Sequence, residues 1–231
     1  MKAFISGTSL TSSTLFKHWD EKKVETPHGD VYLKTTGQYV FLQRHGKKLL
    51  PPHMINHHAN IWALRSLNIR EVIAVNSVGS MKVSIKPGTI CIPDDFIAPW
   101  SIPTFYNYEM KFIVPELDLP LRDRIHKLCV ELGIEVTLGG TYVQTTGPRL
   151  ETKAEINFLR KFGEVVGMTM ASEATLCMEY SLPYVSVCSV DNYCNGVLKE
   201  PLTVAQIQEN ARINSETLEL LIQTIMTGGP L

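Results

Sequence analysis

The sequence of 231 residues lacks the features that mark several broad protein classes. No run approaches the roughly 20 consecutive apolar residues that a membrane-spanning helix needs, and the start MKAFISGTSL has no long apolar core or small-residue cleavage site. We therefore expect a cytoplasmic protein that does not contact a membrane. Lysine and arginine number 22 against 23 acidic residues, so a net charge of −1 offers no general attraction to a nucleic acid. Any anion that binds must be held by local geometry.

Cysteine is scarce and unpaired in pattern. The five cysteines are odd in number and form no C-x-x-C pair, which argues against a disulfide framework or a zinc ribbon, so we expect buried thiols. His53 and His57 have the spacing of metal ligands on a helix, but no Glu follows His53 and no third ligand stands out, so no metal site is predicted. Cys194 lacks an identifiable partner base, which favours a packed thiol over a nucleophile.

Three glycine-based signatures are also missing. The fingerprints G-x-G-x-x-G and G-x-x-x-x-G-K-[ST] do not occur, which removes the usual basis for dinucleotide or nucleoside triphosphate binding. The nucleophile elbow G-x-S-x-G is absent as well, so a serine hydrolase has no platform.

What the sequence does contain is an alternation of strand-like and helix-like segments, which predicts a single α/β domain over residues 1–231. In such folds ligands bind beyond the carboxyl ends of the strands. The segment 98–117 fits neither period and is read as a long excursion over a pocket or at a subunit contact. The expected strands are 2–6, 31–35, 39–43, 71–75, 89–97, 136–145, 164–168 and 184–190, and the expected helices are 53–67, 118–132, 151–162, 171–181 and 202–226.

Oxyanion donors gather at the predicted ends of three strands. Residues 6–9 read Ser-Gly-Thr-Ser, a turn in which backbone N–H groups and hydroxyls can converge on an anion. Arg44 and His45 follow the apolar run 39–42, and an arginine fork suits phosphate. Residues 76–80, Asn-Ser-Val-Gly-Ser, are read as a third strand end of the same kind. Together these ends predict an anion site.

Three later segments add further polar groups. In the segment 147–152, Glu151 precedes a predicted helix, and an ionised carboxylate can only accept hydrogen bonds. The segment 167–173 allows two interpretations. In one, Thr169 and the N–H groups at the start of the following helix bind an anion. In the other, Ser172 is an ordinary N-cap residue of that helix. The segment 189–196 supplies the amide of Asn192.

The ordered set of these motifs resembles one enzyme family. GTS, RHG, HHANIWAL, NSVGS, PGTICIPDDFI, GPRLETKAE, GMTMASE and VDNYCNG, between about residues 4 and 225, are similar to the trimeric purine nucleoside phosphorylases and methylthioadenosine phosphorylases. The resemblance implies an αβα sandwich around a twisted mixed sheet. It also implies a homotrimer with active sites at subunit boundaries, for which His126 and the segment 98–117 are candidate neighbouring contributions.

The resemblance also assigns roles to individual residues. The phosphate-binding residues are Thr8, Arg44, His45, Ser77 and Thr169. The nucleoside-binding residues are Leu150, Glu151, Met168 and Asn192, with Leu150 standing where the family often has Phe against the base. Asn192, Glu151 and His45 are the predicted catalytic residues, and inorganic phosphate is the co-substrate, with no metal or organic cofactor.

Glu151 and Asn192 then indicate the class of base. A 6-oxopurine carries a hydrogen on N1 and an acceptor at O6, which match an acceptor-only carboxylate and an amide donor, whereas N1 of adenine is itself an acceptor. Family members that act on 6-aminopurines carry Ser and Asp at these two positions. We therefore predict phosphorolysis of inosine or guanosine to the free base and ribose 1-phosphate.

Three alternatives stay open at this point. A methylthioadenosine or methylthioinosine phosphorylase shares the phosphate site, and here Asn76 stands where the methylthioadenosine enzymes carry Thr. A nucleosidase would use water and lacks a clamp like Arg44 and His45. A purine-binding module has no use for several oxyanion donors.

Overall fold

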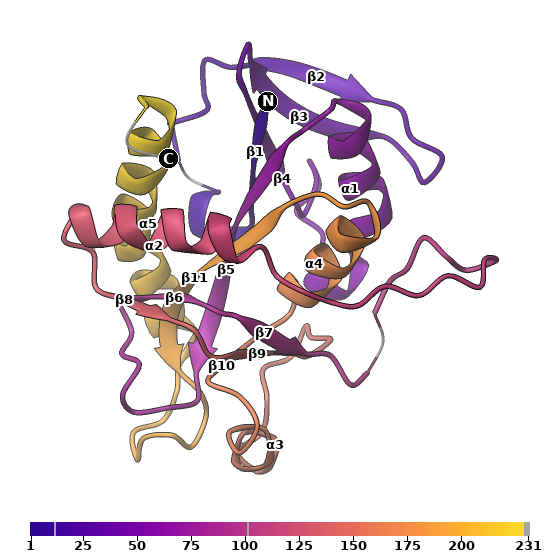
Figure 1. The fold of residues 1–231 in the computed structure, drawn as a ribbon. Helices are drawn as coiled ribbons and strands as arrows, with labels where there is room; N and C mark the ends of the chain where they lie inside the picture. Colours follow the sequence, from indigo (N-terminus) through magenta and orange to yellow (C-terminus); the bar gives the residue numbers. More distant parts are fainter. Residues whose placement is uncertain (12, 101, 229–231) are drawn as a thin grey trace.

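All eleven strands belong to one mixed sheet that carries helices on both faces (Figure 1). The computed structural model describes residues 1–11, 13–100 and 102–228. The strands are β1 (Lys2–Ser6), β2 (Asp20–Val24), β3 (Val31–Thr36), β4 (Tyr39–Gln43), β5 (Glu71–Ser80), β6 (Ile90–Ile92), β7 (Asp95–Ile97), β8 (Val136–Leu138), β9 (Thr141–Gln144), β10 (Val165–Gly167) and β11 (Tyr184–Tyr193). The helices are α1 (His57–Ser66), α2 (Leu119–Glu131), α3 (Lys153–Leu159), α4 (Met170–Glu179) and α5 (Val204–Met226), with short 3-10 turns η1 (Thr8–Leu10) and η2 (Pro52–Met54).

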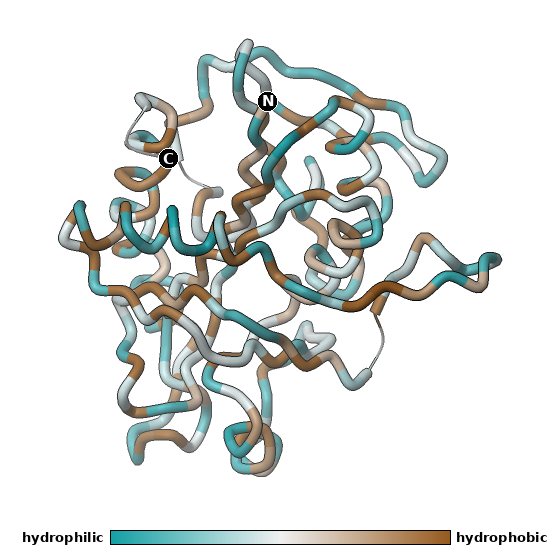
Figure 2. The backbone as a smooth tube through the Cα atoms, viewed as in Figure 1, coloured by the Kyte–Doolittle hydropathy of each residue, from teal (hydrophilic) through white to brown (hydrophobic). Residues whose placement is uncertain are grey.

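The sheet divides the apolar core in two, as an αβα sandwich requires. On one face α1 and α4 bury residues such as Leu64 and Leu176, and on the other α2 and α5 bury Leu121, Ile125 and Ile222. Figure 2 shows the apolar residues gathered along the central strands. The predicted α/β fold is thus confirmed, and no helix of the described residues is long and apolar enough to cross a membrane.

Strand β5 is the centre of the sheet and creates a gap in it. One edge of β5 pairs with β11 along nearly its whole length. The other edge pairs first with β1, up to Ala74, and then with β10, from Gly79 onward. Because β1 is parallel and β10 antiparallel to β5, the carboxyl ends of β1 and β10 point toward each other across residues 75–78 of β5.

Several predicted boundaries are corrected by the structure. The expected strand 89–97 is two strands separated at Pro93, which has no N–H for a ladder, and the expected strand 136–145 is broken at Gly139 and Gly140, where φ is 97° and 102°. The charged strand β2 was not predicted, because four of its five side chains are exposed and no apolar alternation marks it. The expected helix 53–67 begins only at His57, where the side chain of Asn56 caps it by accepting from Ala59 N–H.

Two further corrections concern the segments rich in site residues. The strand expected to end at Val75 continues through residues 76–80 as the second half of β5, and the strand expected to end at Val190 continues as β11 through Asn192 to Tyr193. Both extensions are possible because Ser, Asn and Gly can occupy a strand that is paired with a neighbour. The register of β11 shifts between Val190 and Asn192, which leaves Asp191 at a bulge.

Candidate functional site

A cavity opens at the gap in the sheet, and all nine predicted site residues line it. The cavity and the solvent at its mouth together hold about 800 Å³ of space free of protein atoms. The predicted residues in its wall are Thr8, Arg44, His45, Ser77, Leu150, Glu151, Met168, Thr169 and Asn192. They come from strand ends and loops that are up to 184 positions apart in the sequence, from Thr8 to Asn192. The fold thus brings residues from distant parts of the sequence to one cavity.

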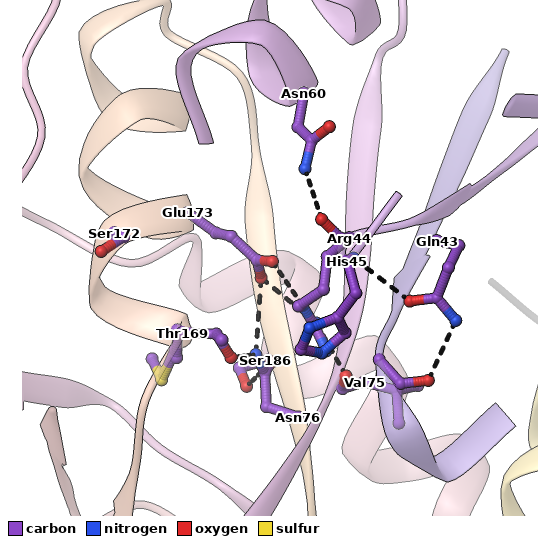
Figure 3. Close-up of polar contacts among 12 residues, drawn as sticks. Gln43, Arg44, His45, Asn60, Val75, Asn76, Thr169, Ser172, Glu173 and Ser186 are labelled. Carbon is purple, nitrogen blue, oxygen red and sulfur yellow. Dashed lines mark hydrogen bonds and ion pairs between the residues drawn. The ribbon is translucent and has the colours of Figure 1, made fainter. Parts of the chain in front are cut away.

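Arg44 is the buried cation of the site. It follows β4, its backbone N–H donates to Ser6 O at 2.9 Å, and its side chain is only 3% exposed. Its Nε donates to Glu173 Oε1 at 2.6 Å, and its Nη2 donates to Val75 O at 2.8 Å and to Glu173 Oε2 at 3.3 Å (Figure 3). The guanidinium is therefore fixed on one edge by a carboxylate and a carbonyl.

His45 and Arg44 converge beside Gly7. A Cβ added at Gly7 would lie 2.6 Å from Arg44 Nη1 and 2.9 Å from His45 Nε2, so only glycine lets both side chains approach the backbone here. His45 Nδ1 lies 2.6 Å from Leu50 O, and because a carbonyl only accepts, Nδ1 carries the hydrogen. Burial lowers the pKa of His45 below its ordinary value, with the charge of Arg44 acting the same way, while the Leu50 hydrogen bond opposes the shift. Neutral His45 thus presents an unprotonated Nε2.

Thr169 reaches the cavity from the start of α4. Its Oγ1 accepts a hydrogen bond of 2.9 Å from Asn76 Nδ2, which leaves its own hydroxyl hydrogen free for a ligand. The backbone N–H groups of Thr169 and Met170 donate instead to the hydroxyl of Tyr142, at 3.1 and 3.4 Å. The expectation that these N–H groups meet an anion is therefore wrong, because a buried tyrosine hydroxyl occupies them.

Ser172 is also not the helix cap that its sequence position suggested. Thr169 is the N-cap residue of α4, and Ser172 lies within the helix, where its Oγ accepts from Gln144 Nε2 at 2.7 Å. Its backbone N–H donates to Gln144 Oε1 at 3.2 Å, so one glutamine side chain satisfies both groups.

Ser77 lies in the wall of the cavity with its hydroxyl already engaged. It donates to Asp191 Oδ2, and Asp191 Oδ1 accepts from Ser189 Oγ at 2.6 Å and from Asn214 Nδ2 at 2.8 Å. Burial raises the pKa of Asp191, while these three hydrogen bonds oppose the shift. Asn210 Nδ2 also donates to Asp191 O at 2.7 Å, so α5 is fastened to the bulge next to Asn192.

The acceptor Glu151 stands at the other end of the cavity. It precedes the capping box of α3, in which Thr152 and Glu155 satisfy the first N–H groups, so its own carboxylate is not needed there. Glu151 is 9% exposed, and its Oε1 accepts from Thr145 Oγ1 at 2.6 Å. One face of the carboxylate is thus fixed by a threonine, and Oε2 is left for a ligand.

Asn192 and Cys194 pack against Gly79. A Cβ at Gly79 would lie 2.6 Å from Cys194 Sγ and 3.1 Å from Asn192 Nδ2, so the close approach of these side chains requires glycine. Asn192 Nδ2 donates one hydrogen to Tyr193 O at 2.9 Å, which leaves a second N–H and Oδ1 for a ligand. Burial raises the pKa of the Cys194 thiol, with the charge of Glu151 adding to it, which fits a packed thiol.

Apolar side chains form the rest of the wall. Met168 and Val166 line it from the β10 side, and Leu202 and Ile207 line it from the start of α5. Leu150 is 42% exposed at the rim, which agrees with an apolar edge that lacks an aromatic ring.

Metal ligation finds no support among the described residues. No group of three or more His, Cys, Asp or Glu side chains there is arranged to hold an ion. His53 lies in η2, whereas His57 is the first residue of α1, so the two do not share the helix that their spacing suggested. His57 is buried, and burial lowers its pKa to about 4, which keeps the imidazole neutral.

Sequence reasoning missed the residues that hold the site residues in place. Glu173, Asp191 and Thr145 are three such partners, and none of them was assigned a role from the sequence, although Glu173 and Asp191 lie within motifs quoted above. For Glu173 the sequence held one signal, an acidic residue in the first turn of a largely apolar helix. In the structure this residue is only 1% exposed. The distance in sequence to Arg44, 129 positions, hides the pairing.

Comparison with known proteins places the chain in a family. The model of the phosphorylase superfamily matches residues 3–227. A probable 6-oxopurine nucleoside phosphorylase of Archaeoglobus fulgidus is 37% identical over 232 residues, covering 97% of this chain and 96% of that protein. A probable S-methyl-5'-thioinosine phosphorylase of Methanocaldococcus jannaschii is 37% identical over 225 residues, covering 92% and 86%. The structure of methylthioadenosine phosphorylase from Schistosoma mansoni in complex with adenine has the same fold, with a TM-score of 0.84 at 24% identity over 100% of this chain and 93% of that one. The chain belongs to the phosphorylase superfamily.

Proposed function

We propose that this protein cleaves 6-oxopurine nucleosides with inorganic phosphate, giving the free base and ribose 1-phosphate. The observation that carries the proposal is the pairing of two unlike ends in one cavity. Donors from Arg44 and Thr169 converge at one end, and the acceptor Glu151 stands with the amide of Asn192 at the other.

The donor end suits an oxyanion that must be both bound and aimed. Arg44 Nη1 and the Thr169 hydroxyl offer hydrogens toward the cavity, and Thr8 lines the same wall. A phosphate held there lies beneath C1′ of the sugar, stabilises the cationic character that develops as the glycosidic bond stretches, and supplies the nucleophile. Ser77 differs from the other donors, because its hydrogen goes to Asp191 and its oxygen therefore meets the ligand as an acceptor.

The acceptor end suits the keto form of a purine. Glu151 Oε2 accepts from N1–H, and the free N–H of Asn192 donates to O6 or N7, where negative charge gathers as the base leaves. Adenine would place its N1 lone pair against the carboxylate. A site built to hydrogen-bond one edge can reject the mismatched analogue by about 10⁴-fold.

One observation favours a methylthio substituent on the sugar as a second candidate. Leu202 and Ile207 give the α5 side of the cavity an apolar wall, which suits a methylthio group better than a hydroxyl. The 6-oxopurine nucleoside of this kind is 5'-methylthioinosine. Neither candidate requires a metal or an organic cofactor, because phosphate supplies the nucleophile.

We further propose that the protein acts as a homotrimer in which a neighbouring copy completes the site. Tyr108, Met110 and Phe112 are almost fully exposed, an arrangement that favours burial by another chain. They belong to the segment 102–117, which projects at the right of Figure 1. Trp100 lines a second cavity whose wall includes Glu151, so a chain seated there would reach the site. Ser101 lies outside the described residues. Light scattering measures the mass in solution, and a monomer contradicts this arrangement.

The test of the main proposal compares four nucleosides with and without phosphate. Inosine and 5'-methylthioinosine should be cleaved and adenosine and 5'-methylthioadenosine should not, and the ratio of the two oxopurine rates gives the 5′ preference. Turnover should stop when phosphate is removed, since the clamp binds the nucleophile. Turnover that persists without phosphate would instead identify a nucleosidase, and preference for the adenine forms would contradict the assignment of Glu151 and Asn192. The cytoplasmic location stays a prediction.

A further inference from the structure

Behind the donor end of the cavity lies a carboxylate that does not line it. Glu173 is 1% exposed, lies in the first turn of α4, and accepts four hydrogen bonds from three side chains through its two oxygens. Its Oε1 accepts from Arg44 Nε, and its Oε2 accepts from Arg44 Nη2, from Tyr184 Oη at 3.1 Å and from Asn76 Nδ2 at 3.4 Å. Figure 3 shows the bonds from Arg44 and Asn76 meeting at this carboxylate.

The first consequence concerns the direction of Arg44. An arginine side chain has five N–H hydrogens in a planar fork. Glu173 and Val75 take the edge formed by Nε and Nη2, so the guanidinium plane cannot turn, and Nη1 is directed to the region of Gly7 and His45 at the cavity. The carboxylate thereby decides which edge of the arginine faces a ligand.

The second consequence concerns the direction of the Thr169 hydroxyl. Because Glu173 only accepts, the amide of Asn76 must turn its NH₂ toward it, while Asn76 Oδ1 accepts from Ser186 Oγ at 2.7 Å. The same NH₂ donates to Thr169 Oγ1, so the threonine accepts there and has its hydrogen free for the anion. The orientation imposed by Glu173 passes through Asn76 to a second donor.

We propose that Glu173 is the positioning residue of the phosphate subsite, which it sets by fixing the donors of Arg44 directly and of Thr169 through Asn76 without touching the anion. The inference rests on the proposed function, since it assumes that phosphate binds at this end.

The direction in which phosphate affinity changes when Glu173 is replaced distinguishes a positioning role from a purely electrostatic one. Glu173 cancels the charge of Arg44, so its removal should strengthen the Coulomb attraction of any anion. If its task is to aim the donors, removal weakens phosphate binding in spite of that gain, because a misplacement of about 1 Å costs on the order of 10²-fold in rate.

The experiment compares Glu173→Gln with wild type by steady-state kinetics and by calorimetric titration with inorganic phosphate. Glutamine keeps the shape, but its NH₂ meets a donor in either orientation of the amide: Arg44 Nε–H in one, and the NH₂ groups of Arg44 and Asn76 in the other. We expect kcat/KM for phosphate to fall about 10²-fold, with KM for phosphate raised and KM for the nucleoside nearly unchanged. Glu173→Asp, which keeps the charge and shortens the reach, should recover part of the loss.

Glu71→Gln is the matched control. It removes a carboxylate that also pairs with an arginine, Arg124, and lies on β5 as Asn76 does, but at the first residue of the strand and outside the cavity wall. We expect its phosphate and nucleoside constants to equal those of wild type.

Two outcomes overturn the proposal. Folded Glu173→Gln with unchanged or tighter phosphate binding shows that charge, not orientation, is what Glu173 contributes. An equal loss of phosphate and nucleoside binding shows a general loosening of the fold. If Glu173→Gln does not fold, Asn76→Ala provides a second test, because it leaves the ion pair of Arg44 and Glu173 intact. We expect it to raise KM for phosphate about tenfold, the effect of losing the hydrogen bond that orients the Thr169 hydroxyl. An unchanged KM for phosphate would contradict the proposal that Glu173 acts on Thr169 through Asn76.

The proposed function fails by a different result. If wild-type protein shows no phosphate-dependent cleavage of any nucleoside, the reaction assignment is wrong. Titration of wild type and Glu173→Gln with inorganic phosphate still measures whether the carboxylate sets the anion subsite.

Discussion

The two ends of the cavity differ in how their polar groups are held. At the phosphate end, Arg44 and Thr169 are fixed by a buried network that joins β4, β5 and α4 through Glu173 and Asn76. At the base end, Glu151 is held by one hydroxyl, that of Thr145, and the remaining wall is largely apolar. The phosphate end is therefore preorganised by the core, whereas the base end depends on a few local contacts.

This difference has a physical reason. A compact anion loses a large hydration free energy on binding, and only donors that are already aimed can replace it without further cost. A purine is bound mainly by apolar contact over its faces, and a few polar groups suffice to select its edge. Substitutions at the phosphate end should hence affect the rate most strongly.

The largest effect is expected for Arg44→Ala. It removes the buried cation and leaves Glu173 unpaired, so kcat/KM for phosphate should fall by about 10²-fold or more, while nucleoside affinity changes little. Kinetics with varied phosphate at saturating inosine measure this. Unaltered phosphate kinetics would show that Arg44 does not bind phosphate, and would contradict the conclusion that the phosphate end is the more strongly preorganised of the two.

Asn192→Asp tests the selection of the base. The carboxylate cannot donate to O6 or N7 when ionised, so turnover of 6-oxopurine nucleosides should fall by about 10- to 10²-fold and the preference should move toward adenine nucleosides. The ratio of kcat/KM for inosine to that for adenosine is the measurement. An unchanged ratio means that Asn192 does not read the base.

Thr145→Val sharpens the comparison at the weaker end. The isosteric change removes only the hydroxyl that fixes Glu151, so KM for the nucleoside should rise about tenfold, the amount of one hydrogen bond to a charged group. KM for phosphate should not move. A rise in both constants would show that the two ends are coupled and not separately built.

The smallest effect concerns pH and His45. Because Nδ1 donates to Leu50 and burial lowers the pKa, neutral His45 only accepts at Nε2, and it must take up a proton before it donates to phosphate. A bound anion raises the pKa, so phosphate affinity should weaken as the pH rises through the pKa of the complex, by at most about tenfold per pH unit. His45→Gln should lack this slope. The titration of phosphate itself affects both proteins equally, so parallel profiles would contradict a role for His45.

The sequence predicted a large part of this arrangement. Arg44, His45 and Thr169 follow strands, and the expectation that strand ends converge agrees with the placement of all the predicted site residues in the wall of one cavity. The predicted ends of the strands 71–75 and 184–190 were too early, since residues 76–80 and Asn192 lie in the extended strands β5 and β11. These residues have the polar composition of a turn because the part of a strand that lines a cavity does not need apolar side chains.

The amino-acid order by itself determined which chemical groups are present: an arginine fork, hydroxyls beside glycine, a carboxylate and an amide, each at the end of a predicted element. Only the tertiary structure decided which of these groups are already hydrogen-bonded and which are free to bind a ligand. The capture of α4 N–H groups by Tyr142, the donation of Ser77 to Asp191 and the fixing of Arg44 by Glu173 join residues from 27 to 129 positions apart. Hydrogen-bond direction depends on which partner lies within about 3 Å in space, and distance along the chain carries no such information.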